Sequence, residues 1–414
     1  MRTEQEKITW LESYEEVRDA FSHPTLVQAS YESAKKTVFA NVLVTLDGPA
    51  HLQRRRTEMA LVKPHMLSLL EQTMVPTAAK RILTQFAQQQ EMDLVDALRI
   101  VTTAMACDIV GLDGCDSVEQ INQLDRLTRK LHEGATIDWS VRSTADLASE
   151  LKLAMEQYRN EFLLPSLNRR RSLISETPAP TAQHIDLLTI LLSHTELLDM
   201  NDTKIMHESI HFLLATAHTS ANAVVHAFDD YWTWLADHPE DQSRMSDPAF
   251  IQRCIHETLR LRPPTGFQKR IAPTDCALKS GRQFQAGEMI GLNLITASRD
   301  PKYYGATAAE YNPDRVTPEQ VPRYGFAFGL GAHNCLGKRL STGAQNPDNG
   351  AGVLVVLFTE LLALHCCPHR SKPPLELPTT LRHQFSSYPT SFDAQSTSHP
   401  SNFRPLIPVQ ASTV

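Results

Sequence analysis

The chain has 414 residues, of which 42% are hydrophobic, enough for a large folded core. Its net charge of −7, with both signs interspersed, argues against a protein that binds nucleic acid through a basic surface. Seven cysteines without the spacing of a disulfide framework favour a reducing compartment. No apolar stretch approaches the roughly 18 residues of a membrane span, and no signal peptide is present, so we expect an intracellular, cytoplasmic protein.

Apolar residues recur at intervals of three and four along most of the chain, which is typical of amphipathic helices. The predicted helices cover residues 11–21, 52–75, 92–112, 117–133, 143–166, 185–193, 203–236, 248–261 and 351–365. Strand-like alternation is rare and clusters at 266–295. Residues 177–181, rich in proline, predict a helix-breaking connection, and 367–414 a loop-rich C-terminal part with short strands. We therefore expect a mainly α fold with small β-sheets, forming a single domain over 1–414.

One cysteine has an unusual setting. Residues 328–337 read Phe-Gly-Leu-Gly-Ala-His-Asn-Cys-Leu-Gly. A thiolate that ligates haem iron must be deprotonated and shielded, and the start of a helix stabilises its negative charge. Gly329 would let the loop turn tightly, Gly337 would let the next helix approach a flat ring, and Phe328 would shield the sulfur of Cys335. The alternative is a free cysteine in an ordinary turn.

A possible charge cluster precedes this loop. Glu257 and Arg260 lie three residues apart on a predicted helix that two prolines end, and Arg315 follows in Tyr-Asn-Pro-Asp-Arg. Such a pair alone could be a surface ion pair that contributes little to stability. With the second arginine, it could instead form a buried cluster of one glutamate and two arginines.

The order of these motifs, E-x-x-R, P-x-R and then the cysteine loop, resembles the cytochrome P450 family of haem-thiolate enzymes, in its soluble bacterial type. The resemblance runs from about Thr9 to the C-terminus, and by it we expect a first helix and strand of the family to be missing. It implies the P450 fold, a haem b cofactor with Cys335 as the axial iron ligand, and a purely structural role for the Glu257 cluster.

The resemblance also implies which residues bind the haem propionates, whose carboxylates need cationic partners when partly buried. His51 and Arg55 match the family's entry to its third helix. Arg270, after the Glu257 helix, and His333, before the cysteine, fill the other usual positions. Arg54 and Arg56, on either side of Arg55, could instead belong to a solvated helix face.

The oxygen side of the haem would lie along residues 212–220. There Ala215 and Thr219 match the family, but Thr216 replaces a usual glycine and His218 replaces a usual carboxylate. Thr219 could supply the hydroxyl and His218 the titratable group of a proton relay, because an imidazole has an ordinary pKa near ~6.5. Alternatively, His218 is a polar residue that faces water or another helix, and Thr219 bonds the carbonyl four residues back.

By this resemblance, the chain inserts one oxygen atom of O2 into a small, largely apolar substrate, in specialised metabolism, with electrons from an NADPH reductase or a ferredoxin. A haem-thiolate isomerase, dehydratase or peroxide-using enzyme, which needs no external electrons, is the alternative. A remote alternative is a zinc peptidase, because residues 207–211 read His-Glu-Ser-Ile-His, the H-E-x-x-H pattern. A cluster of helix breakers at 345–350 is expected to interrupt the helix after Cys335.

Overall fold

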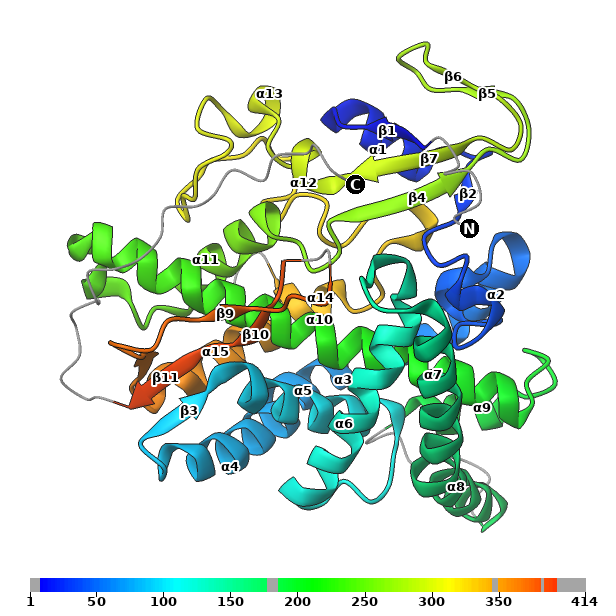
Figure 1. Cartoon of the computed structure of the whole chain (residues 1–414), viewed down its shortest axis with the longest axis horizontal. Coiled ribbons are helices and arrows are strands. Elements are labelled where there is room, and N and C mark those ends of the chain that lie inside the picture. The colour runs from blue at the N-terminus through cyan, green and yellow to red at the C-terminus, as the bar shows by residue number, and fades with distance from the viewer. Residues whose placement is uncertain (1–7, 177–184, 345–348, 381–382, 393–414) are drawn as a thin grey trace.

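The computed structural model describes residues 8–176, 185–344, 349–380 and 383–392. Helices form most of it, and a small sheet lies at one end (Figure 1). The α-helices are α1 (Tyr14–Ser22), α2 (Gly48–Glu58), α3 (Pro64–Leu69), α4 (Val75–Ala87), α5 (Leu94–Val110), α6 (Val118–Ala135), α7 (Thr144–Tyr158), α8 (Leu164–Glu176), α9 (Leu187–Ser193), α10 (Asp202–Asp237), α11 (Pro248–Leu261), α12 (Leu294–Ala297), α13 (Pro301–Tyr304), α14 (Lys338–Thr342) and α15 (Val353–Ala363). The expected mainly α fold is confirmed.

The strands are short, and those in the described ranges form four small sheets. They are β1 (Thr9–Leu11), β2 (Val27–Gln28), β3 (Glu91–Asp93), β4 (Phe267–Ile271), β5 (Cys276–Ala277), β6 (Gln283–Phe284), β7 (Met289–Asn293), β8 (Cys366–Pro368), β9 (Leu375–Glu376), β10 (Phe385–Ser387) and β11 (Pro389–Phe392). The largest sheet has the order β1-β7-β4-β2, with β1 parallel to β7 and the other pairs antiparallel. Because Gln28 pairs with Arg270, this sheet places the arginine beside the N-terminal segment.

Helix α10 runs through the middle of the molecule (Figure 1). It has 36 residues, begins at an Asn201 side-chain cap, and buries residues on several faces. Its largest partner is α5, and it also packs against α11, α6 and α15. Since helices are amphipathic when they cover a core, a helix apolar on several sides is expected to be enclosed by others. The candidate oxygen-side residues lie in the middle of this helix.

The prediction of one continuous helix over 52–75 is wrong. The structure breaks it at Lys63, which has extended backbone angles (φ −65°, ψ 152°), because Pro64 disfavours a helical residue before it. Helix α4 was missed: it continues α3 through the π-helical turn at Leu70–Met74, and its proline lies directly after that turn. The helix expected over 143–166 extends through a π-helical turn to Glu176. The predicted connection at 177–181 lies outside the described residues.

The interruption predicted after the cysteine loop is confirmed. Helix α14 ends at Thr342 and α15 begins only at Val353. Residues 345–348 lie outside the described part, but the two sides of the interruption meet. A Cβ atom added to Gly352 would lie 2.4 Å from the backbone N of Gly343. After the interruption, the chain therefore returns to contact distance of Gly343, where α14 has just ended.

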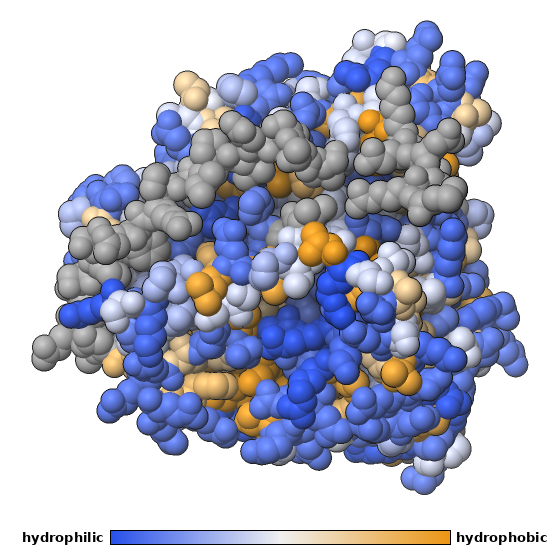
Figure 2. All heavy atoms as spheres, in the orientation of Figure 1, coloured by the Kyte–Doolittle hydropathy of each residue, from blue (hydrophilic) through white to orange (hydrophobic). Residues whose placement is uncertain are grey.

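The surface is mostly hydrophilic on the face that Figure 2 shows, with hydrophobic residues scattered among charged ones. Within residues 8–176, 185–344, 349–380 and 383–392, every helix is too short or too polar to cross a bilayer. Large hydrophobic side chains that remain exposed, such as Leu52 on α2 and Val316 in a loop, lie in separate parts of the chain.

Candidate functional site

The cysteine loop holds Cys335 just before α14. The Cys335 N–H donates to the Phe328 carbonyl at 2.8 Å, and a 3₁₀ turn at Gly331–His333 lies between them. Burial raises the pKa of the Cys335 thiol, while the backbone N–H groups of Gly337 and Lys338 favour the thiolate. Cys335 is nevertheless exposed by accessible surface. Because the Cys335 side chain is surrounded by protein and yet accessible, it faces an opening inside the molecule.

Two glycines of this loop need backbone angles that only glycine adopts easily, Gly329 with φ +59° and Gly331 with φ +68°. A Cβ at Gly331 would also lie 2.4 Å from the Phe21 carbonyl oxygen. Gly337 is different: among the described residues, a Cβ there would meet only the Cys335 Sγ, at 3.9 Å. The surface beside the sulfur is therefore open, which fits the edge of a flat ring.

The four propionate candidates come together from α2, β4 and the cysteine loop. The His51 and His333 rings lie 4.2 Å apart, and Arg55 donates to Asn334 beside Cys335. His333 Nε2 lies 3.1 Å from the Asp47 carboxylate. Burial alone would raise the pKa of Asp47, but its hydrogen bond to His333 and the histidine charge lower it overall.

Two of these candidates present buried donors that have no partner among the described residues, His51 Nε2 and Arg270 Nη2. Each residue is only 2% exposed. Burial lowers the pKa of His51 to about 4 and that of Arg270 to about 10. Arg270 Nη1 is satisfied by Gln28, at 2.9 Å. Unpaired buried donors are costly, and a group with two carboxylates would satisfy both. The donor set therefore fits a haem.

On the oxygen side, Ala215 is exposed although its neighbours on α10 are largely buried, so this helix face also meets an opening. The Thr219 hydroxyl donates to the Ala215 carbonyl. That is the local bond that was the alternative to a role in proton relay. Because a hydroxyl keeps its lone pairs while it donates, Thr219 Oγ can still accept a hydrogen bond.

His218 turns toward neighbouring helices. Arg99, on α5, approaches Nδ1 at 2.9 Å, and Nε2 lies 3.2 Å from the Thr128 carbonyl on α6. The His132 ring stacks on it at 4.0 Å. These partners indicate a neutral ring with its proton on Nε2, and burial, with the Arg99 charge, keeps the pKa of His218 well below its usual value. Among the described residues, His218 has no bond to Thr219.

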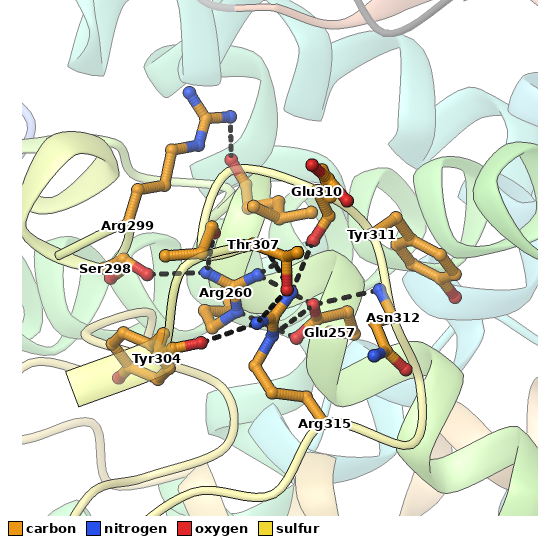
Figure 3. Close-up of polar contacts among 12 residues, drawn as sticks. Glu257, Arg260, Ser298, Arg299, Tyr304, Thr307, Glu310, Tyr311, Asn312 and Arg315 are labelled. Atoms are coloured by element: carbon orange, nitrogen blue, oxygen red, sulfur yellow. Dashed lines mark hydrogen bonds and ion pairs between the residues drawn. The ribbon is translucent and has the colours of Figure 1, made fainter. Parts of the chain in front are cut away.

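The Glu257 cluster is buried (Figure 3). Glu257 Oε1 accepts from Arg260 Nη2 at 2.7 Å and from Arg315 Nε at 2.9 Å. Arg260, which is fully buried, also donates to the Ser298 carbonyl at 2.7 Å. Arg315 donates to the Tyr304 carbonyl at 2.6 Å. The cluster therefore connects α11 to the ends of α12 and α13 and to the loop that carries Arg315, all of which precede the cysteine. The surface ion-pair alternative is wrong.

The zinc alternative finds no support among the described residues, which contain no group of three metal-ligating side chains. His207 Nδ1 pairs with the Ala40 carbonyl and His211 Nδ1 with Glu208, at 3.0 Å each. Glu208 is fully buried and accepts from Arg54 and from the Leu43 backbone. The carboxylate is occupied as a structural acceptor.

Sequence reasoning missed three residues near the site. Arg54 is 2% exposed, whereas its neighbour Arg56 faces solvent, so only one of them lies on a solvated face. Asp47, which binds His333, stands directly before α2 in the segment already singled out. Arg99 carried no local signal, because it meets His218 from 119 residues away.

Comparisons with known proteins bear on the family and the fold of the chain. Residues 4–343 match the family profile described as "Cytochrome P450". The chain is 25% identical over 345 residues to "Putative cytochrome P450 137" of Mycobacterium tuberculosis, covering 78% of this chain and 69% of that protein. It is 24% identical to "Pulcherriminic acid synthase" of Bacillus subtilis, covering 79% and 78%. A crystal structure of CYP109E1 from Bacillus megaterium in complex with testosterone has a TM-score of 0.70 at 18% identity, covering 95% of both chains.

Proposed function

The chain belongs to the cytochrome P450 family of haem-thiolate monooxygenases, and on that premise we propose that it inserts one oxygen atom of O2 into a small, largely apolar substrate. Membership implies a haem, O2, a substrate and a redox partner. The finer proposals concern this chain's residues: haem b with Cys335 as axial ligand, and electrons from an NADPH reductase or a ferredoxin.

One observation carries the proposal: an accessible cysteine shares its site with two buried donors that have no partners within the described part of the chain. His51 and Arg270 would hold the propionates, together with Arg55 and His333. The N–H groups of Gly337 and Lys338 would hold negative charge on the sulfur. When bound, a haem with a thiolate ligand supplies O2 activation, since thiolate donation favours O–O cleavage.

We assign Thr219 the proton-carrying role on the opposite side. Its hydroxyl lies on the accessible face of α10 with Ala215, and rotation away from the Ala215 carbonyl would free its O–H to donate toward a bound molecule. The partners of His218 give it another role. It would hold α10 against α5 and α6 through Arg99 and Thr128, and would so position Thr219.

The apolar character of the substrate rests on the uncharged α10 face around Ala215 and Thr219. The complex of CYP109E1 with testosterone is an example of a similar fold with an apolar ligand. A role in specialised metabolism remains a proposal at the level of the family.

Binding of carbon monoxide tests whether Cys335 ligates the haem iron. The reduced protein with carbon monoxide should show the red-shifted Soret band of thiolate ligation, and Cys335→His should abolish that band. Cys276→Ser, a change at a half-buried cysteine elsewhere, should leave it intact. A red-shifted band in Cys335→His would refute the assignment.

The need for electrons tests the reaction class. Thr219→Ala should keep the haem content but divert reductant to hydrogen peroxide, because only the proton supply changes. Turnover without any electron donor would instead establish an isomerase, a dehydratase or a peroxide-using enzyme.

A further inference from the structure

A pair of cysteines lies where α5 ends and α6 begins. The Sγ atoms of Cys107, in the last turn of α5, and Cys115, in the following turn, are 2.9 Å apart, and both cysteines are free. Gly111 (φ +89°) and Gly114 (φ +76°) reverse the chain between them. The turn therefore holds two thiols closer than ordinary packing contact.

The pair lines a cavity of about 580 Å³ that contains none of the haem-site residues. Its wall is polar: Arg170 donates to Asp186 at 3.0 Å and approaches Asp113 at 3.4 Å. Cys115 is half-buried, whereas Cys107 is 2% exposed. A small polar oxidant can therefore reach Cys115 first, with Cys107 directly behind it.

We propose that Cys107 and Cys115 form a redox-active dithiol that hydrogen peroxide oxidises to a disulfide. The Cys115 thiolate attacks a peroxide oxygen, so that an S–O bond forms, the O–O bond breaks, and the leaving hydroxide takes a proton to become water. Cys107 sulfur then attacks Cys115 sulfur. The S–S bond forms, the S–O bond breaks, and the Cys107 proton leaves with the hydroxide as a second water. Two electrons pass from the two thiols to one peroxide.

The order of attack follows from the local chemistry. Burial raises the pKa of Cys107 well above its usual value, and Cys107 lies at a helix C-terminus, where negative charge is disfavoured. Cys115 lies outside the helix and meets the cavity. The accessible thiol is therefore the one that meets peroxide, and the buried thiol resolves the product.

The disulfide would join the end of α5 to the segment before α6. Closing this loop removes conformations from the unfolded chain, so the oxidised protein should melt about 2–5 °C higher than the reduced one. Because α5 is the main partner of α10, this stabilisation would act on the helix that carries Thr219.

Peptide mapping of the haem-loaded protein tests the proposal directly. The reduced protein is treated with a small excess of hydrogen peroxide, and the Soret band is followed to confirm that the haem survives. The protein is then unfolded in urea and its free thiols are alkylated, so that the buried Cys107 is also accessible to the reagent. Trypsin leaves both cysteines on peptide 100–126, and cleavage before Asp108 and Asp113 separates them. We expect the two fragments to stay joined after peroxide and to separate after a reductant is added.

Two variants complete the test. Cys115→Ser should lose the linkage and the rise in melting temperature, whereas Cys276→Ser, at another half-buried cysteine, should keep both. The wild-type mapping needs no variant, so a failure of Cys115→Ser to fold does not affect it. If Cys107 and Cys115 both stay open to alkylation at a peroxide concentration that oxidises Cys276, the proposal is wrong.

Discussion

At the scale of single residues, the site combines groups that are unfavourable without a ligand. Arg270 is a buried cation and His51 a buried imidazole, and one nitrogen of each has no partner among the residues that the structure describes. Each would cost stability in a protein that bound nothing there. The arrangement is explained if an anionic group shares the site.

Arg270→Gln should therefore weaken haem retention without destabilising the haem-free protein. A hydrogen bond to a charged group contributes about 1.5–3 kcal/mol, so we expect haem to transfer to apomyoglobin about 10- to 100-fold faster. Lys269→Gln, at the next position of β4, is the matched control, because Lys269 lies over the Trp139 ring. Equal losses of thermal stability in holoprotein and apoprotein would show that Arg270 is only structural.

Glu58, on α2, is a third uncompensated group. It is fully buried, both its oxygens lack a hydrogen-bond partner among the described residues, and Arg54 Nε is 4.0 Å away. Burial, with the nearby Glu208 charge, raises the pKa of Glu58 well above its usual value. The folded protein therefore keeps a proton that the unfolded chain releases.

The sign of the pH effect follows. Above the unfolded pKa of about 4.3, the folded state binds more protons, so the free energy of unfolding falls as pH rises toward the folded pKa. Glu58→Gln removes this term and should be more stable than wild type at pH 8, with the difference shrinking toward pH 5. Urea unfolding at several pH values measures it, with the exposed Glu240→Gln as control. Parallel pH profiles for Glu58→Gln and wild type would contradict the assignment.

At the scale of elements, Glu257 joins α11 to the loops that lead to Cys335. Removing one member of a buried charge cluster leaves its partners uncompensated, at roughly 3–5 kcal/mol. Glu257→Ala should therefore yield little folded holoprotein, since this loss is a large part of the free energy of unfolding of a typical protein. Glu32→Ala removes an exposed pair of the same spacing, with Lys35, and should change unfolding by less than about 1 kcal/mol. Comparable melting of the two variants would refute the buried role.

The sequence predicted elements whose signal is local. The spacing of Glu257 and Arg260, the helix of His51 and Arg55, and the strands around Arg270 lie as expected. It did not predict the partners of His218, because periodicity assigns a residue to a helix face but not to a neighbour, and Arg99 comes from a distant segment. The buried state of Arg54 was equally invisible, since the acceptor Glu208 lies 154 residues away.

At the scale of the whole molecule, the family match ends at residue 343, where α14 has just ended and the interruption begins. The two sides of this interruption are held together by α11. Gln252 Nε2 donates to the Thr342 carbonyl at 2.9 Å and to the Ala351 carbonyl at 3.3 Å. The packing of α14 and α15 therefore does not depend on the length of chain between them.

Deletion of residues 344–350, which joins Gly343 to Ala351, should then leave a folded protein that binds haem. The deletion removes the bond from Ala344 N to the Gly350 carbonyl, 2.7 Å, and the bonds that Gln252 and Arg339 donate to the Ala344 and Asn349 carbonyls, 2.9 Å each. It keeps the Gln252 bonds to the Thr342 and Ala351 carbonyls. Since loop-closure entropy changes slowly with loop length, we expect a melting temperature within about 3 °C of wild type. Gln252→Ala removes the bonds to both Thr342 and Ala351. It should lower the melting temperature more than the deletion does, both in the full-length protein and in the deletion variant. A deletion variant that aggregates or loses the thiolate-type carbon monoxide band would show that the segment supports the cysteine loop.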